Sequence, residues 1–568
     1  MPTIISDGRR NHPGRSRRQA PVHGKGRQVD EAARAEVETT IDGMPRDRDM
    51  LIEHLHRLQD AYGCLHARHL RGLADILKLS MAEVFEVATF YAHFDVVLEG
   101  EAPPPAVTVR VCDSLSCMLA GAETLIAALE DGTDPAAVHI VRAPCMGRCA
   151  EAPAAEVGHR AVAPATPEAV AATIAAGEFS AVMPPYTALP AYRAEGGYAL
   201  LADVRSGKKS AEDMISTLSD AGLRGLGGAG FPAGRKWEIV RGFPGPRLMT
   251  VNGDEGEPGT FKDRHWLERD PHRFLEGALV AAHVVGAERV YIYMRDEYPA
   301  VLKILKAEIA ALEAAGLAAP GVLEVRRGAG AYICGEESAM LESIEGKRGL
   351  PRHRPPYIAE VGLFGKPTLN HNVETLFWIR DIVEKGADWF ASQGVNGSKG
   401  FRSWSVSGQV KSPGVILAPA GITVRELIAR AGGMKDGHVF KAYLPGGASG
   451  GILPADKGDI PLDFGGKLAE EGCFVGSHAV VILSDQDSMK DVALNLLRFF
   501  HDESCGQCTP CRNGTTKAVG LMEKGVWDAA LLEDLCQVMA DASICGLGQA
   551  APNPIRCVMK HFAEEVGL

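Results

Sequence analysis

Two features that would place a protein in or across a membrane are missing from this sequence of 568 residues. No stretch approaches the roughly 18 consecutive apolar residues that a membrane-spanning helix requires. The basic pairs Arg9-Arg10 and Arg17-Arg18 are not followed by the apolar run of a secretory signal. We therefore expect a cytoplasmic protein without a membrane span.

Positive charge is scarce outside one short segment. The net charge is −12, although residues 1–27 contain seven Arg or Lys and one Asp, so the rest of the chain is strongly acidic. An acidic body argues against nucleic-acid binding. The N-terminal segment has no helical periodicity, and we predict a disordered basic arm over residues 1–27. This arm either docks on an acidic neighbour or is simply solvated.

The composition is that of an ordinary folded protein, with 46% hydrophobic and 23% charged residues. At roughly 150 residues per domain, the chain has room for about four domains. Residues 28–100 are predicted to form a helical N-terminal domain. Their apolar positions recur at spacings of three and four, as at Leu51, Leu55, Leu58 and Tyr62.

The remaining periodicity predicts a multidomain α/β and α+β fold. Alternating valines predict a strand over 106–112, and a second strand is expected around 138–141. A stretch with Pro and Gly at 184–198 predicts a linker. Helical stretches then alternate with short apolar runs such as 289–294, which predicts an α/β domain.

The C-terminal part divides into two predicted modules. Between 401 and 485, short strand-like segments surround an amphipathic stretch from Val424 to Ala429, which predicts a small α+β module. The last 80 or so residues are expected to be largely helical and are interrupted by loops rich in cysteine.

Thirteen cysteines are too many for chance packing and too clustered for a scattered disulfide framework. Cys505, Cys508 and Cys511 follow one another at intervals of three, and Cys545 lies on a later loop. Three thiolates on a tight loop can hold three corners of a cubane, which a distant fourth thiolate closes. Because structural zinc usually takes its ligands as two separated pairs, this spacing favours a [4Fe–4S] cluster over zinc.

A second set of cysteines consists of two pairs, each after a predicted strand: Cys112 with Cys117, and Cys145 with Cys149. Two such pairs can bind the two irons of a [2Fe–2S] cluster. Zinc is a stronger alternative here than at the first set, because structural zinc usually takes its ligands as two separated pairs. The other five lack this spacing and are interpreted as small buried hydrophobic residues: Cys64, Cys334, Cys473, Cys536 and Cys557.

A glycine-rich segment at 222–237 contains Gly225, Gly227 and Gly230 with the spacing of a dinucleotide-binding fingerprint. A Rossmann fold requires a strand immediately before the first glycine, whereas the preceding MISTLSDAGL looks like the end of a helix. We therefore predict another phosphate-binding use. The backbone would approach a phosphate closely, and Arg224 and Lys236 would neutralise it.

Two further stretches, 252–264 and 328–338, are unusually polar for a folded α/β domain. Loops of acidic residues and glycine are often no more than solvated turns. Alternatively, several carboxylates and an amide that converge on one pocket would suit the ribityl hydroxyls and ring edge of a flavin.

Four motifs together resemble the peripheral NADH-oxidising module of respiratory complex I: GLRGLGGAGFPAGRKW, NGDEGEPGTFKDR, GAYICGEES and ESCGQCTPCR, in this order. Residues 28–185 resemble its thioredoxin-like [2Fe–2S] subunit, and residues 195–565 resemble its flavin-carrying, NADH-binding subunit. The resemblance implies a thioredoxin-like [2Fe–2S] domain at 101–185, an FMN- and NAD(H)-binding domain at 195–395, a β-grasp (soluble-ligand-binding-like) module at 400–485 and a helical [4Fe–4S] domain at 486–568.

The same resemblance implies the cofactor contacts. Around the FMN phosphate and ribityl chain it implies Arg224, Gly225, Gly227, Gly228 and Lys236. For the rest of the flavin it implies Asn252, Asp254, Glu255, Tyr332, Gly335, Glu336, Glu337, Asn372 and Thr375. For NADH it implies Phe231, Glu257, Arg354 and Tyr357. Glu257 and Glu337 are the catalytic residues that we predict.

Two positions depart from the family pattern. His371 stands where an asparagine is usual, and Arg354 stands where a lysine is expected before Pro-Pro. These departures concern the flavin amide contact and the NAD phosphate contact.

Fused modules of this kind serve NAD-dependent formate dehydrogenases and NAD-reducing hydrogenases. Through RDMLIEHLHRLQDAYG, APCMGRCAEAPAAEVG and GKRGLPRHRPPY, the sequence most resembles the β subunit of the molybdenum- or tungsten-containing formate dehydrogenases. The resemblance implies a partner α subunit with a molybdenum or tungsten pterin, whose electrons reduce NAD⁺ reversibly through iron–sulfur clusters and FMN. The alternatives are a hydrogenase diaphorase subunit, a complex I subunit, or a zinc-stabilised scaffold without redox chemistry.

Overall fold

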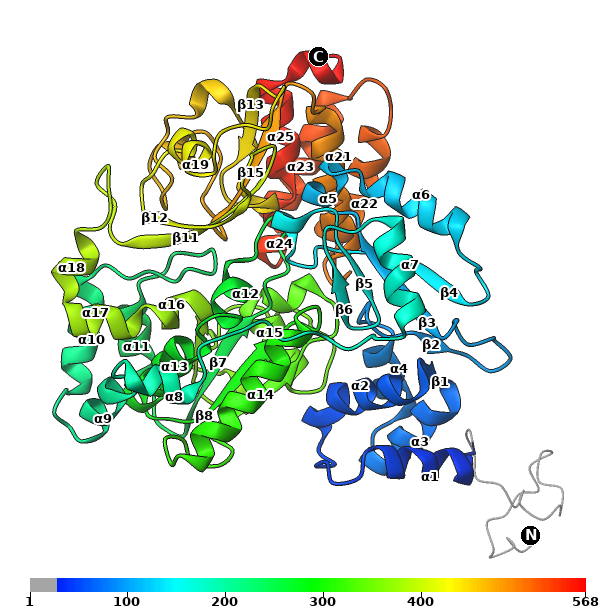
Figure 1. Ribbon diagram of the computed structural model, residues 1–568, viewed down its shortest axis with the longest axis vertical. Helices are drawn as coiled ribbons and strands as arrows, with labels where there is room; N and C mark the ends of the chain where they lie inside the picture. Colours follow the sequence, from blue (N-terminus) through cyan, green and yellow to red (C-terminus); the bar gives the residue numbers. More distant parts are fainter. Residues whose placement is uncertain (1–27) are drawn as a thin grey trace, which may run out of the picture.

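The computed structural model describes residues 28–568, so the basic arm predicted for residues 1–27 lies outside the described residues. Figure 1 shows five consecutive regions in chain order. The N-terminal helices lie at one end of the molecule, and the C-terminal helices lie beside the yellow β-rich region at the other end. The parallel-sheet region, drawn in green, lies beside the N-terminal helices and below the yellow region.

The first region is helical, as its periodicity predicts. Its elements are α1 (Glu31–Thr40), α2 (Leu51–Tyr62), β1 (Leu65–His66), α3 (Ala67–Leu77), α4 (Met81–Ala88) and β2 (Val96–Val97). Helix α2 buries Leu51, Leu55 and Leu58 on one face and ends at Gly63, which adopts the left-handed conformation that favours glycine. A capping box between Ser80 and Glu83 begins α4.

The second region is a four-stranded sheet with the order β4-β3-β5-β6. Its elements are β3 (Val107–Cys112), α5 (Leu115–Leu119), α6 (Ala122–Gly132), β4 (Val138–Ala143), β5 (Ala155–Val157), β6 (Arg160–Val162) and α7 (Pro167–Ala176). The strands predicted at 106–112 and 138–141 are confirmed as β3 and β4. Because these two strands are parallel, their carboxyl ends lie at the same edge of the sheet.

The linker predicted over 184–198 contains helix α8 (Leu189–Ala194). Tyr192 on this helix is buried, and its hydroxyl donates a hydrogen bond of 2.7 Å to Glu276. The linker prediction did not anticipate this helix or its buried tyrosine. Pro and Gly mark the ends of this segment, but they do not reveal the buried partner that holds its centre.

The third region is a parallel sheet with the order β10-β7-β8-β9, covered by helices. Its strands are β7 (Arg247–Gly253), β8 (Ala287–Met294), β9 (Leu323–Arg327) and β10 (Thr368–Asn372). Its helices are α9 (Ala199–Arg205), α10 (Ala211–Asp220), α11 (Ala233–Gly242), α12 (Lys262–Leu267), α13 (Pro271–Val285), α14 (Pro299–Ala314), α15 (Glu337–Ile344), α16 (Val373–Phe377), α17 (Ile379–Lys385) and α18 (Ala387–Ala391). Helix cover on a parallel sheet explains why β8 forms from a continuous apolar run.

The fourth region is a five-stranded sheet with the order β12-β11-β15-β13-β14. Its elements are β11 (Phe401–Gly408), β12 (Gly414–Pro419), α19 (Val424–Arg430), β13 (Phe440–Leu444), β14 (Leu453–Pro454), α20 (Lys467–Glu470) and β15 (Ala479–Ser484). The amphipathic stretch from Val424 to Ala429 forms α19, which begins with a capping box between Thr423 and Glu426.

The last region is helical and contains α21 (Met489–Asp502), α22 (Thr509–Met522), α23 (Ala529–Ala542), α24 (Gly546–Ala550) and α25 (Pro552–His561). Cys505 and Cys508 lie on the loop from α21 into α22, Cys511 lies in the first turn of α22, and Cys545 lies immediately before α24. Among the described residues, no helix is long and apolar enough to cross a membrane.

Candidate functional site

The four C-terminal cysteines converge. Cys505, Cys508, Cys511 and Cys545 line one small cavity together with Ile333 and Leu547. Cys508 precedes the first turn of α22 and Cys545 precedes that of α24, so the positive ends of two helix dipoles face this cavity. Burial raises the pKa of the Cys545 thiol to about 12. Such a thiol becomes a thiolate readily only beside a metal or another positive charge.

The other four predicted cysteine ligands also meet, at the edge of the sheet where β3 and β4 end. Cys112 is the last residue of β3, and Cys145 lies two residues beyond β4. The Cys145 and Cys149 sulfurs are 3.3 Å apart, and the Cys112 thiol contacts those of Cys117 and Cys145. All four are buried. Of the remaining cysteines, Cys473 and Cys557 lie with their sulfurs 3.7 Å apart.

A cavity of about 340 Å³ lies between these two cysteine sites. Ten of the predicted cofactor residues line it: Gly227, Gly228, Asn252, Asp254, Glu255, Glu257, Tyr332, Gly335, Glu336 and Asn372. Its other walls come from regions in which no sequence pattern indicated a flavin contact: Ser449, Phe474, Gly476 and Ser477 from the fourth region, and Phe500, Gly546, Leu547 and Ala550 from the last. The cavity is thus assembled by three regions of the chain.

The glycine-rich loop follows α10 and leads into α11, and β7 comes only afterwards. The prediction that this loop is not a Rossmann loop is therefore confirmed. A Cβ atom on Gly227 would lie 3.0 Å from the Cβ of Asn372, and Gly228 has a φ of +128°. Thr375 fixes the loop because its hydroxyl accepts a 2.9 Å hydrogen bond from the Leu226 amide.

The polar loop at 252–264 is held by its own side chains. Asn252 donates a 2.8 Å hydrogen bond to the Gly335 carbonyl. The Glu255 carboxylate accepts from the Asp263 and Arg264 amides at the start of α12, at 2.7 and 3.1 Å. Burial nevertheless raises the pKa of Glu255 to about 7 and that of Asp254 well above its ordinary value. This wall of the cavity therefore holds costly buried carboxylates.

Glu257 is the predicted catalytic residue whose partner comes from another region. Its carboxylate accepts a 2.9 Å hydrogen bond from the amide of Ser449, and the Ser449 hydroxyl contacts the same oxygen. Burial raises the pKa of Glu257, and these hydrogen bonds oppose that shift. Lys262, which sequence reasoning missed, also lines the cavity and pairs with Asp263 at 2.8 Å and Glu374 at 3.2 Å.

Eight predicted residues do not line this cavity: Arg224, Gly225, Phe231, Lys236, Glu337, Arg354, Tyr357 and Thr375. Arg354 contacts Glu336 and lies 3.0 Å from Glu337, so it belongs to the rim beside Glu336. Phe231 and Tyr357 are exposed aromatic side chains. The Lys236 ammonium lies 5.9 Å from the Phe231 ring centre.

His371, the first departure from the family pattern, does not line the cavity, whereas its neighbour Asn372 does. The Trp237 indole N–H donates a 2.7 Å hydrogen bond to Nε2 of His371. Burial and nearby Lys236 hold the pKa of His371 well below its ordinary value, so the imidazole is neutral. His371 therefore links β10 to Trp237 on α11 and does not line the cavity.

The cavity borders the C-terminal cysteine site directly and is connected to the other cysteine site through the polar loop. Ile333 and Leu547 line both the cavity and the C-terminal cysteine site. On the other side, Phe261 packs on Cys145 and Cys149, and Arg264 donates a 3.0 Å hydrogen bond to the Gly147 carbonyl. Neither residue lines the cavity, but both belong to the polar loop whose residues Asp254, Glu255, Gly256, Glu257 and Thr260 do. The cavity therefore lies between the two cysteine sites.

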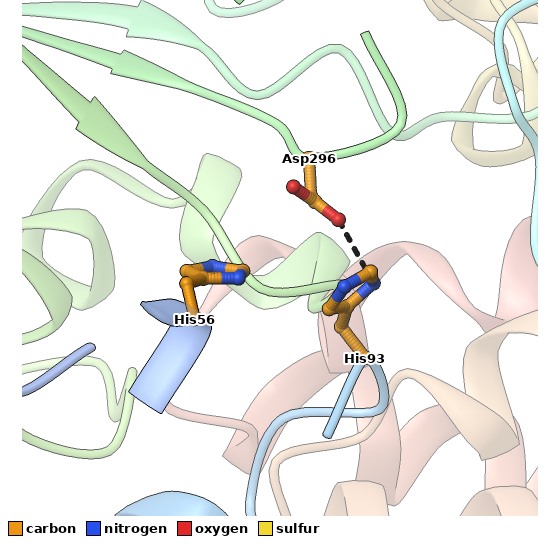
Figure 2. Close-up of side chains that lie close together, drawn as sticks. All are labelled: His56, His93 and Asp296. Atoms are coloured by element: carbon orange, nitrogen blue, oxygen red, sulfur yellow. Dashed lines mark ion pairs between the residues drawn. The ribbon is translucent and has the colours of Figure 1, made fainter. Parts of the chain in front are cut away.

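A cluster of His56, His93 and Asp296 lies where the N-terminal helices meet the parallel-sheet region (Figure 2). One potential ligand atom from each residue lies within 4.8 Å of the others. However, Asp296 is paired with His93 at 2.8 Å and also with the guanidinium of Arg327. That positive charge opposes a divalent cation, and we interpret the cluster as an ion-paired contact between regions.

Four family models match the chain. They are the thioredoxin-like [2Fe-2S] ferredoxin at 37–178, the Nuo51 FMN-binding domain at 218–381, the SLBB domain at 405–453, and the NADH-ubiquinone oxidoreductase-F iron-sulfur binding region at 491–567. They confirm the predicted fold class and the cofactors FMN, [2Fe–2S] and [4Fe–4S], with NAD as the substrate.

The residues around the cavity fit FMN. Oδ2 of Asp254 is buried and has no hydrogen-bond partner among the described residues. A ligand hydroxyl group could donate a hydrogen bond to this oxygen. The glycine backbone at 227 and 228 leaves room that a side chain would fill, and the Lys262 ammonium supplies buried positive charge beside the carboxylates.

Known proteins are similar in sequence or structure to most of this chain. The F 2 subunit of the NADH-quinone oxidoreductase of Rhizobium meliloti is 42% identical over 66% of this chain and 93% of its own length. The HndC subunit of the NADP-reducing hydrogenase of Solidesulfovibrio fructosivorans is 40% identical over 66% of this chain and 79% of its own length. A crystal structure of an NAD⁺-reducing [NiFe]-hydrogenase in the H2-reduced state superposes with a TM-score of 0.81 at 32% identity, covering 92% of both chains. The chain belongs to the family that contains the F subunits of NADH-quinone oxidoreductases and the similar subunits of NAD(P)-reducing hydrogenases.

Proposed function

We propose that this chain is the NAD(H)–FMN diaphorase and electron-transfer subunit of an NAD-dependent formate dehydrogenase. One observation supports electron transfer above all: the cavity that fits FMN shares walls with the C-terminal cysteine site, and the loop that lines it continues into residues that contact the other cysteine site. Ile333 and Leu547 lie on one side, and Phe261 and Arg264 lie on the other. A flavin in the cavity would therefore lie close to both iron–sulfur clusters.

We assign the ligands as follows. The [2Fe–2S] cluster is held by Cys112, Cys117, Cys145 and Cys149, and the [4Fe–4S] cluster by Cys505, Cys508, Cys511 and Cys545. The flavin is held by the ten predicted residues that line the cavity. Arg224, Gly225, Lys236 and Thr375 support the glycine-rich loop, and Glu337, which lies at the rim 3.0 Å from Arg354, would act with Glu257 as the second catalytic residue. NADH enters over Phe231, Arg354 and Tyr357.

When bound, FMN supplies the chemistry that accepts two electrons as hydride and releases them singly. The residues of this chain would bind and orient the FMN and the NADH. Asn252 and Glu255 fix the polar loop, while Phe474, Phe500 and Leu547 keep water from the inner wall. Ser449 holds the Glu257 carboxylate in one orientation. Because proximity supplies much of the rate, no side-chain nucleophile is required.

The choice of a formate-oxidising partner is supported by the sequence resemblance of residues 48–63, 143–158 and 346–357. In this proposal, a molybdenum or tungsten pterin in the α subunit oxidises formate, and the electrons reduce NAD⁺ reversibly. A hydrogenase partner is the second candidate. It is supported by the similarity to the NAD⁺-reducing [NiFe]-hydrogenase over 92% of the chain.

Activity assays of the isolated chain and of the native complex distinguish the two candidate partners. We expect the isolated chain to oxidise NADH with an artificial dye, but neither to oxidise formate nor to split hydrogen. The purified complex should reduce NAD⁺ with formate and not with hydrogen. Activity with hydrogen alone would move the assignment to the hydrogenase, and formate turnover by the isolated chain would contradict the electron-transfer role.

A further inference from the structure

Arg295 connects the two redox sites through one side chain. It follows β8 and is 3% exposed. Its Nη2 donates a 2.5 Å hydrogen bond to the carbonyl oxygen of Cys145, and its Nη1 donates to the carbonyl oxygen of Glu255. One guanidinium therefore joins the backbone of a proposed cluster ligand to the backbone of a residue that lines the flavin cavity.

Two neighbours of Arg295 hold the same cysteine loop. The Arg295 guanidinium lies 5.0 Å from the centre of the Tyr298 ring. The Tyr298 hydroxyl donates a 3.0 Å hydrogen bond to the Glu255 carboxylate, and it lies 2.0 Å from where a Cβ atom on Gly147 would be. Arg264 donates to the Gly147 carbonyl at 3.0 Å. Arg264, Arg295 and Tyr298 belong to the FMN-binding region, and all three contact the loop from Cys145 to Cys149.

The charge of Arg295 acts on the carboxylates of Asp254, Glu297 and Glu503 as well as on the Cys145 thiol. Glu297 pairs with it through Nε and Nη2, each at 3.1 Å, and is itself less buried than Arg295. The remaining N–H groups point at Cys145 and Glu255. Reduction of an iron–sulfur cluster adds negative charge, and hydrogen bonds and positive charge nearby stabilise that state.

We propose that Arg295 is a positioning residue that fixes the cysteine loop against the flavin cavity and raises the reduction potential of the [2Fe–2S] cluster. The inference rests on the proposed assignment of Cys112, Cys117, Cys145 and Cys149 as ligands. Arg295 itself belongs neither to the proposed cluster ligands nor to the predicted flavin contacts.

The test compares three variants of the full-length holoprotein by redox titration of the [2Fe–2S] paramagnetic signal, with iron and FMN content measured alongside. R295Q removes the positive charge and shortens the reach, whereas R295K retains the charge. R327Q is the matched control, because Arg327 is a largely buried guanidinium nearby that pairs with Asp296 and Asp60 and does not contact the cysteine loop.

We expect R295Q to lower the equilibrium constant for one-electron reduction at least tenfold, which corresponds to about 59 mV. R295K should recover most of this shift, and R327Q should show none. Loss of the [2Fe–2S] signal in R295Q, with the [4Fe–4S] cluster and FMN retained, would also support the positioning role if R327Q keeps the signal.

Two results would overturn the inference. One is a wild-type potential in R295Q with full cluster content. The other is an equal effect in R327Q, which would show that any buried charge at this contact has the same influence. Absence of a [2Fe–2S] signal from the unmodified protein would instead contradict the proposed ligand assignment, so the two failures are distinguishable.

Discussion

The backbone N–H of Ser449 donates a hydrogen bond of 2.9 Å to Oε1 of Glu257. Glu257 belongs to the polar loop of the FMN-binding region, whereas Ser449 belongs to the SLBB-like region. The amide of Asn553 on α25 in turn donates a 2.8 Å hydrogen bond to the Ser449 carbonyl. The position of the Glu257 carboxylate therefore depends on contacts among three regions of the chain.

The first prediction concerns this contact. Hydrogen bonds from Ser449 favour the charged form of Glu257, so S449A should raise the pKa of Glu257 further. If the ionised carboxylate serves NADH oxidation, the acidic limb of kcat/KM against pH moves to higher pH. Dye reduction by NADH measures this profile. S449T, which keeps the hydroxyl, should restore the original limb, and an unchanged limb in S449A would count against the role of Glu257.

The second prediction concerns the C-terminal cluster. C545S should lose the [4Fe–4S] signal, and iron should fall from about six atoms to about two, because no fifth cysteine of the described residues lines this cavity to replace Cys545. C536S is the control, since Cys536 is fully buried on α23 and lies outside the cavity. Equal iron loss in both variants would show that the effect is general destabilisation.

The third prediction uses two glycines with nearly the same backbone conformation. Gly147 has a φ of +65° and Gly177 a φ of +66°. A Cβ at Gly147 would lie 2.0 Å from the Tyr298 hydroxyl, whereas nothing lies within 4 Å of one at Gly177. We expect G177A to cost about 1–2 kcal/mol through backbone strain alone. G147A should cost clearly more and lose the [2Fe–2S] signal. Thermal unfolding and iron analysis compare the two, and similar outcomes would contradict the contact.

The fourth prediction concerns pH and stability. Burial lowers the pKa of His56 from 6.5 to about 3, and Arg327 adds to this shift. Between these values the unfolded state binds a proton that the folded state does not, so stability falls as the pH drops below 6.5. H56Q should reduce this fall between pH 6.5 and 5, measured as the thermal unfolding midpoint. H353Q, at an exposed histidine, should leave the fall unchanged.

Local spacing by itself determined much of the chemistry. The interval of three between Cys505, Cys508 and Cys511 predicts a cluster because neighbouring thiolates on one tight loop need no tertiary information to meet. Likewise, the alternating valines of β3 and the helix before Gly225 are encoded in adjacent residues. These features predicted the fold class, the iron–sulfur clusters and the exclusion of a Rossmann loop, whereas FMN and NAD were implied by the resemblance of four motifs to a known family.

Tertiary structure alone decided which residues close the cavity and how the redox sites are connected. Ser449, Phe474 and Leu547 are far from the polar loop in sequence, and no periodicity marks them as cavity walls. The same holds for helix α8, whose Tyr192 is buried against Glu276. Periodicity reports which face of an element is buried, but not what covers it. The contact of Arg295 with both Cys145 and Glu255 therefore emerges only when the chain is folded.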